Sequence, residues 1–131
     1  MKLSKNFTLS EFASHDGAPT PPDVLTNLQE LAANLQVLRD YLNCPIKINS
    51  GYRSPAHNKA VGGAQFSQHV LGKAADISCN KYTPEQVHAA ILHLIKSGKL
   101  KSGGVGIYDS WVHYDTRGTN ARWDLRKHKQ N

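Results

Sequence analysis

Long uninterrupted apolar runs are absent from the 131-residue sequence, so no stretch has the composition of a membrane-spanning helix. The N-terminal residues, MKLSKNFTLSEF, also lack the continuous apolar core of a cleaved signal peptide. Internal repeats and linker-like segments are missing as well, and a chain of this length builds one hydrophobic core. We therefore expect a single domain over residues 1–131 that is synthesised in the cytoplasm and does not insert into a membrane.

Cysteine is scarce, because Cys44 and Cys79 are the two cysteines of the sequence. Two cysteines do not make the disulfide framework of a small secreted domain. Cysteine is also among the residue types most often buried as a free thiol. We expect two buried free thiols, with a single bridge as the alternative.

Several catalytic motifs are absent. The sequence contains no Gly-x-Ser-x-Gly elbow, and neither cysteine lies in a nucleophile signature. The glycines Gly103, Gly104 and Gly106 are not followed by a helical pattern, so they do not form a dinucleotide-binding fingerprint. These absences disfavour serine or cysteine nucleophiles and a nicotinamide cofactor.

Acidic residues are outnumbered, with 10 Asp and Glu against 16 Lys and Arg, and the formal net charge is +6. Such a balance favours anionic partners, among them nucleic acid, anionic lipid and anionic cell-wall polymers. The basic stretch Arg126–Lys129 is the local feature that would suggest nucleic acid, and a solvated tail accounts for it more simply. We expect no nucleic-acid partner.

Hydrophobic periodicity predicts two helices, at about Val24–Leu42 with Asp23 as N-cap, and at Pro84–Ser97. Alternation and short apolar runs predict four strands, at Ile46–Ser50, Ala74–Ser78, Gly103–Tyr108 and Trp111–Thr116. A long loop from Ser50 to Lys73 and a tail from Arg117 complete the chain. This order indicates an α+β fold with a small, mostly antiparallel sheet and flanking helices.

Three residues have the chemistry of a metal site. Asp76 lies inside the apolar run of a predicted strand, where a carboxylate is costly to bury unless it is paired or bound to a metal. His69 precedes it by seven residues, and His113 lies on a strand whose one face also carries Trp111 and Asp115. Two imidazoles and a carboxylate suit zinc with an open fourth position. The alternative is a loop histidine, a paired carboxylate and a half-buried strand histidine.

The sequence His113-Tyr114-Asp115 also matches the start of the two-histidine, one-carboxylate iron site of oxygenases. That site needs a second histidine later in the chain. His128, in the basic tail, is the one histidine that follows. We disfavour the iron site for this reason.

The segment SGYRSPAHNKAVGGAQFSQHVLGKAADI resembles the signature of the zinc D-Ala-D-Ala carboxypeptidase-like peptidases, which share a fold with hedgehog and lysostaphin-type proteins. GVGIYDSWVHYDTRG resembles the second zinc strand of that family, and ARW and the N-terminal NFTLSEF are similar to its other segments. The resemblance implies the same fold and one zinc ion per chain. By position it assigns the zinc ligands to His69, Asp76 and His113.

The resemblance also implies roles for residues near these ligands. Arg53 matches the arginine that faces the substrate, where it pairs with a carboxylate or holds a carbonyl oxygen. Ser67 and Gln68 border the first ligand and are weaker candidates for substrate contact.

The general base departs from the family pattern. Many members carry an acidic residue three positions before the last zinc histidine, and here that position is Ser110. Asp115 is our first candidate for the base, because it shares a strand face with His113, and Asp109 is the second. A structural role for Asp115, next to the ligand or paired with Arg117 or Arg122, stays equally open.

The activity implied is zinc-dependent hydrolysis of peptide bonds in peptidoglycan stem peptides or cross-links, of the carboxypeptidase or endopeptidase type. A monomeric phage endolysin that reaches the cell wall after phage-mediated release fits the chain's size, charge and lack of a signal peptide. The alternative is a non-catalytic wall-binding module of the same fold, which the Ser110 departure motivates.

Overall fold

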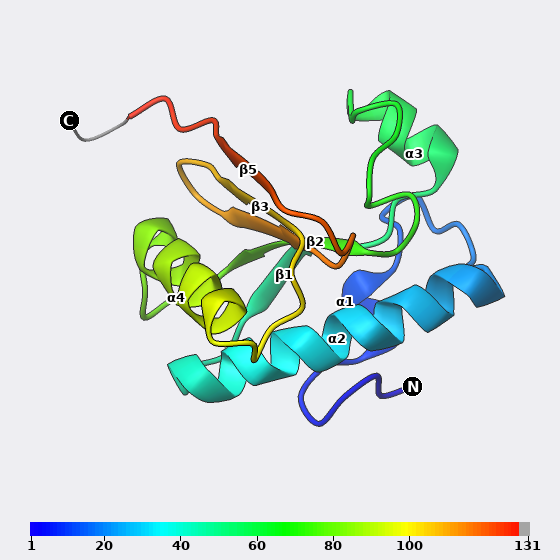
Figure 1. Cartoon of the computed structure of the whole chain (residues 1–131). Helices are drawn as coiled ribbons and strands as arrows, with labels where there is room; N and C mark the ends of the chain where they lie inside the picture. Colours follow the sequence, from blue (N-terminus) through cyan, green and yellow to red (C-terminus); the bar gives the residue numbers. More distant parts are fainter. Residues whose placement is uncertain (129–131) are drawn as a thin grey trace.

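A computed structural model describes residues 1–128 of the chain (Figure 1). The helices are α1 (Leu9–Phe12), α2 (Pro22–Leu42), α3 (Pro55–Ala60) and α4 (Pro84–Lys96). The strands are β1 (Lys47–Ser50), β2 (Ala74–Ser78), β3 (Gly104–Ile107), β4 (Val112–Asp115) and β5 (Ala121–Asp124). Lys129, the last residue of the expected basic stretch, lies outside the described residues. Within residues 1–128, no helix combines the length and apolar composition needed to cross a bilayer.

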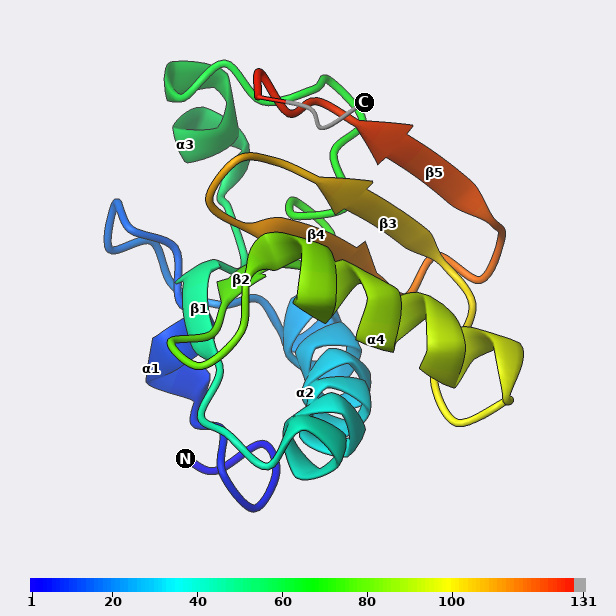
Figure 2. The same ribbon diagram turned by 90° about the vertical axis from the view of Figure 1, so that its left-hand side faces the viewer.

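The five strands form one sheet in the order β1-β2-β4-β3-β5. The pairs β1–β2, β2–β4 and β4–β3 are antiparallel, and β5 joins the edge parallel to β3 (Figure 2). The predicted α+β class with a mostly antiparallel sheet is confirmed. The sheet contains one strand more than predicted, because β5 lies in the segment that was expected to be a tail.

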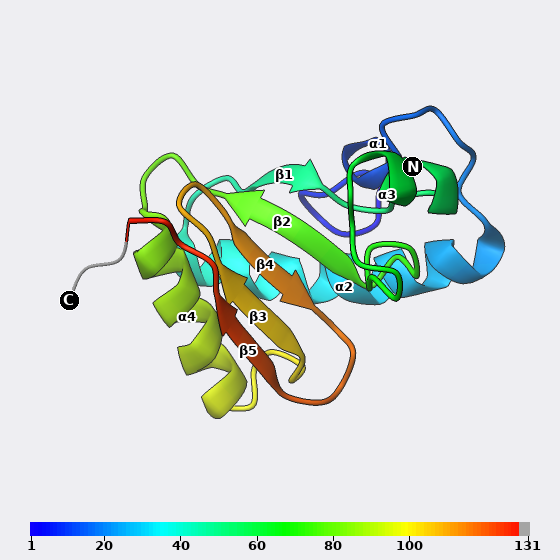
Figure 3. The same cartoon turned by 90° about the horizontal axis from the view of Figure 1, so that it is seen from above.

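The hydrophobic core lies between the sheet and the helices α2 and α4, which cover the same face (Figures 1 and 3). On β4, the side chains of Val112 and Tyr114 are buried in this core. Because side chains alternate along a strand, His113 and Asp115 point to the opposite face. The largest buried core residues of the helices and strands include Leu28, Leu31, Leu35, Leu38, Ile77, Ile91, Leu94 and Val105.

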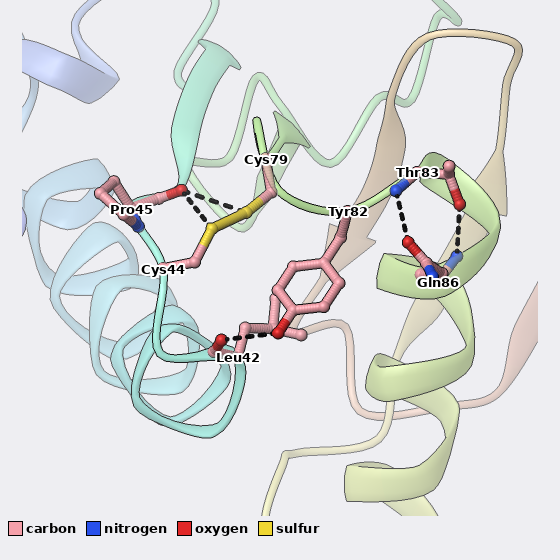
Figure 4. The surroundings of a disulfide bond; sticks show 7 residues. All are labelled: Leu42, Cys44, Pro45, Cys79, Tyr82, Thr83 and Gln86. Atoms are coloured by element: carbon pink, nitrogen blue, oxygen red, sulfur yellow. Dashed lines mark hydrogen bonds between the residues drawn. A yellow bond between two sulfur atoms is a disulfide. The ribbon is translucent and has the colours of Figure 1, made fainter.

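The helix ends follow local chemistry. Helix α2 begins with Pro22 at its first position and Pro21 as N-cap, so the expected N-cap Asp23 lies instead in the first turn, where its charge favours the helix dipole. Helix α4 begins with a capping box, in which Thr83 and Gln86 bond to each other's backbone amides (Figure 4). Both predicted helices are confirmed to within two residues at each end.

The predicted loop from Ser50 to Lys73 contains the short helix α3. The side chain of Ser54 accepts a hydrogen bond from the backbone amide of His57, and Pro55 occupies the first helical position. A serine cap followed by proline is a start signal even without apolar periodicity. The expectation of an irregular segment was therefore wrong for these six residues.

The two cysteines form a disulfide, so the expectation of free thiols was wrong. Cys44 follows the end of α2, and Cys79 directly follows β2 (Figure 4). The antiparallel register of β1 and β2 pairs Lys47 with Ser78, which brings the flanking cysteines together across 35 residues of sequence. Nearby, the Tyr82 hydroxyl donates a hydrogen bond to a carbonyl at the end of α2.

Candidate metal centre

Strand pairing brings the predicted ligands together. In the antiparallel register of β2 and β4, which lie side by side in Figure 3, Asp76 is directly opposite His113. His69 reaches the same place from the segment after α3. Asp76 Oδ1 lies 3.4 Å from His69 Nε2 and 3.3 Å from His113 Nδ1. The three ligand atoms all lie within 4.8 Å of one another, and the two histidines are buried.

The outer nitrogens of both imidazoles are already engaged. His69 Nδ1 lies 2.8 Å from the carbonyl oxygen of Gly51, and His113 Nε2 lies 2.7 Å from Asp115 Oδ2. A ring nitrogen that faces a carbonyl or carboxylate oxygen carries the proton. In the neutral rings, the lone pairs of His69 Nε2 and His113 Nδ1 therefore point at the Asp76 carboxylate. Three ligand atoms that converge in this way form a site suited to a cation.

The ionisation of these groups agrees with a cation site. Burial alone would raise the pKa of Asp76, but the contacts with His113 and His69 outweigh it and hold that pKa below its usual value. Burial would lower the pKa of His113, yet its contacts with the Asp115 and Asp76 carboxylates raise it overall. Both shifts follow from the close packing of the two imidazoles against the Asp76 and Asp115 carboxylates.

The residues present fit zinc. With zinc–ligand bonds of about 2.0–2.1 Å, neighbouring ligand atoms of a tetrahedral site lie about 3.3–3.4 Å apart. The separations of Asp76 Oδ1 from the two histidine nitrogens match this spacing. Two histidines and one carboxylate also leave a fourth position open, as catalytic zinc sites do.

Arg53 holds the carboxylate of Asp76. Its Nη2 lies 3.3 Å from Asp76 Oδ2, its Nε donates to Ser50 Oγ, and its Nη1 donates to Asn58 Oδ1. The guanidinium therefore holds Oδ2 and leaves Oδ1 toward the histidines. The side chain of Arg53 is 17% exposed and borders the open cleft beside the site.

Asp115 is fully buried beneath His113 and has many donors around it. Besides His113, it accepts hydrogen bonds from the backbone amides of Gly104 and Arg117 and from two nitrogens of the Arg117 guanidinium. Burial would raise the pKa of Asp115, but the hydrogen bonds from His113 and Arg117 outweigh it and lower that pKa overall. Gly104 is required here, because a Cβ at that position would collide with the Asp115 carboxylate.

The metal centre opens into a cleft of about 700 Å³. One wall is the segment that leads to His69, and it includes the predicted contact residues Ser67 and Gln68. The Oε1 atom of Gln68 is buried and has no hydrogen-bond partner in residues 1–128. Further lining comes from β5 and from residues just outside the strands, namely Tyr108, Trp111, Arg117, Trp123 and Leu125.

The structure brings six predicted site residues to this cleft, namely Arg53, Ser67, Gln68, His69, Asp76 and His113. Asp109 is not among the lining residues. It is exposed in the turn after β3, where its carboxylate accepts hydrogen bonds from the backbone amides of Lys127 and His128. These contacts, led by that with His128, lower the pKa of Asp109. Asp109 thus anchors the end of the described chain.

Sequence reasoning missed the aromatic wall of the cleft. The Trp123 ring lies 4.8 Å from the His113 ring, and its Nε1 donates a 2.9 Å hydrogen bond to the Tyr108 hydroxyl. Tyr108 in turn stacks on Trp111. The signal in the sequence was the triplet Ala-Arg-Trp at the end of the family-like region, which lies in β5.

A family model described as peptidase M15 matches residues 4–115, which include the three predicted ligands. A search of curated proteins finds no match.

Proposed function

The chain belongs to the peptidase M15 family, and from this premise we propose that it is a zinc-dependent hydrolase of peptide bonds in peptidoglycan stem peptides or cross-links. Membership of the family supports peptidase activity. The zinc ion, the peptidoglycan substrate and the roles of individual residues are our proposal. The observation that carries it is the convergence of His69, Asp76 and His113, whose ligand atoms lie within 4.8 Å of one another while the outer ring nitrogens face Gly51 and Asp115.

Zinc held by these ligands would polarise the scissile carbonyl and make a water molecule a stronger nucleophile. The chain itself holds and orients the reactants. Arg53 is paired with Asp76 and also borders the cleft. Its guanidinium can therefore donate hydrogen bonds to a carboxylate or carbonyl oxygen of the substrate. Ser67 and Gln68 line the cleft beside His69, at a place where they would contact a bound peptide.

Of the two roles left open for Asp115, its contacts favour the positioning of His113. The carboxylate is fully buried, does not line the cleft, and uses both oxygens to accept hydrogen bonds from His113, Arg117 and Gly104. A carboxylate that receives the second N–H of a metal-binding histidine fixes the ring and raises its basicity as a ligand. We assign Asp115 this role in the proposal.

The proposed substrate and place of action agree with two further features. The formal charge of +6 favours binding to an anionic cell wall. The bridge between Cys44 and Cys79 favours action outside the reducing cytoplasm, since disulfides persist in oxidising surroundings. Both features suit a wall-degrading enzyme that reaches its substrate after phage-mediated release.

A second candidate is a wall-binding module without catalysis. Ser110 occupies the position where many family members carry an acid, and among the described residues that line the cleft the one carboxylate is the ligand Asp76. Such a module would bind zinc and walls without releasing products.

Mass analysis of the soluble fragments from purified peptidoglycan separates the two candidates. We expect the wild-type protein to release stem-peptide fragments whose masses identify the cleaved bond, and His113→Ala to release none. Tyr41→Phe, a change on the exposed face of α2 away from the cleft, serves as the control and should match the wild type. Wall binding by the zinc-loaded protein without any fragment would overturn the catalytic proposal.

A further inference from the structure

Among the ionisable side chains that line the described cleft, Tyr108 is the one with neither an ion-pair partner nor a proposed ligand role. The other ionisable residues that line the described cleft are the three ligands and two arginines. Both arginines are paired, Arg53 with Asp76 and Arg117 with Asp115. Tyr108 carries no charge partner in residues 1–128, and its hydroxyl has one hydrogen bond there, received from Trp123.

The Tyr108 hydroxyl is held in place from two sides. Its ring stacks on Trp111 with the ring centroids 4.6 Å apart and the planes at 13°. Its oxygen accepts the 2.9 Å hydrogen bond from Trp123 Nε1, and the same indole lies against His113. The hydroxyl is therefore held by the same indole that packs on His113, in the wall of the same cleft.

A glycine makes this arrangement possible. Gly106 on β3 pairs with His113 on β4 and with Trp123 on β5. A Cβ at Gly106 would collide with the indole ring, so a side chain there would push Trp123 away from both His113 and Tyr108. The Tyr108–Trp123 pair is thus built into the sheet beside the metal centre.

Because Trp123 donates to the Tyr108 hydroxyl oxygen, the O–H proton of Tyr108 remains available for a hydrogen bond to another acceptor. A phenol hydroxyl both donates and accepts, and here its oxygen already receives the indole N–H. No hydrogen bond among residues 1–128 uses the Tyr108 hydroxyl as a donor. Because the phenol oxygen already accepts the indole N–H, the chain of hydrogen bonds is cooperative and the hydroxyl is a better hydrogen-bond donor.

We propose that Tyr108 is a catalytic residue, whose hydroxyl donates a hydrogen bond to the substrate oxygen that becomes negative during hydrolysis; the inference rests on the proposed peptidase function. In that reaction the water oxygen bonds to the carbonyl carbon, the C–N bond breaks, and a proton of the water ends on the leaving nitrogen. Tyr108 keeps its own proton throughout. Trp123 is the positioning residue that orients the hydroxyl.

Replacing Tyr108 by Phe tests this role, because Phe retains the stacking on Trp111 and removes the donor. Loss of one donor to a developing oxyanion typically lowers kcat by about a hundredfold to a thousandfold. We expect a loss of at least about tenfold in kcat with a nearly unchanged KM, zinc content and melting temperature. Tyr41→Phe, the same chemical change at a distant exposed tyrosine, should leave every value unchanged.

Binding of a phosphinate dipeptide, whose tetrahedral P–O group imitates the oxyanion, gives a readout without turnover. We expect calorimetry to find binding at least about tenfold weaker for Tyr108→Phe than for the wild type, and Trp123→Phe to lie between them. A wild-type protein that hydrolyses no wall peptide would refute the proposed function. An active wild type with an equally active Tyr108→Phe variant would refute the inference alone, as would loss of zinc or fold in that variant.

Discussion

Replacing Asp115 by Asn separates the two roles that the sequence left open for this residue. Asp115 Oδ1 accepts hydrogen bonds from Gly104 and from two nitrogens of Arg117, and Oδ2 accepts from His113 and the guanidinium. In either orientation of the Asn side chain, its NH₂ group faces at least two of these N–H donors. The substitution therefore removes at least two hydrogen bonds of a fully buried group.

The expected cost follows from these contacts. Removal of one partner from a buried ion pair destabilises a protein by about 3–5 kcal/mol, and the partial exposure of Arg117 places this case at the lower end. Loss of the carboxylate that holds a metal-binding histidine lowers metal affinity by about tenfold to a hundredfold, or about 1.4–2.7 kcal/mol. We expect both effects in Asp115→Asn.

Competition between the protein and a chromogenic zinc chelator measures the affinity, and thermal unfolding measures the stability. Asp109→Asn is the matched control, because it makes the same change at an exposed carboxylate outside the cleft. We expect its zinc affinity to equal that of the wild type. If Asp115→Asn bound zinc as tightly as the wild type but lost about a hundredfold in kcat, the positioning role would be refuted. Asp115 would then be the general base. A larger loss in Asp109→Asn would move that role to Asp109.

Three further outcomes are expected. Arg53→Lys cannot bridge Asp76 and substrate with one ammonium group, so kcat/KM should fall while zinc content stays at one per chain; normal kcat/KM would remove Arg53 from the site. The pKa of Asp16 is lowered from an ordinary 3.8 to about 2, mainly by the hydrogen bond from the Ser54 side chain. The stability that the Asp16 carboxylate adds is therefore complete above about pH 4 and is lost as the pH falls through about 2. Thermal unfolding of Asp16→Asn should therefore differ from the wild type at pH 7 and coincide with it near pH 2; a difference independent of pH would contradict this. Reduction of the Cys44–Cys79 bridge, which closes a loop of 35 residues, should lower the free energy of unfolding by about 3–4 kcal/mol in denaturant titrations, and an unchanged midpoint would show that the bridge adds no stability.

Elements with strong periodicity were predictable from the sequence. The leucine stripe of α2 and the apolar run around Asp76 in β2 each contain their own signal, because burial against one core imposes regular spacing. The grouping of His69, Asp76 and His113 was predicted through the family resemblance, because the residue types alone left a paired carboxylate and ordinary histidines as the alternative. The structure brings all three ligands to one point.

Features that depend on distant pairing were not predictable. Strand β5 has four residues, two of them charged, and its place is fixed by parallel pairing with β3 across a connection that local sequence does not specify. The bridge between Cys44 and Cys79 depends on the register of β1 and β2. The wall of Tyr108 and Trp123 depends on both β5 and the missing side chain of Gly106.

Zinc titration of the metal-free protein tests the central claim most directly. Metal is removed with a chelator, zinc is added back in fractions of an equivalent, and release of stem-peptide fragments is measured by mass spectrometry at each step. With His69, Asp76 and His113 as one zinc site, activity should rise in proportion to added zinc and reach its plateau at about one equivalent per chain. Hydrolysis that persists without zinc, or that needs two equivalents, would contradict the account.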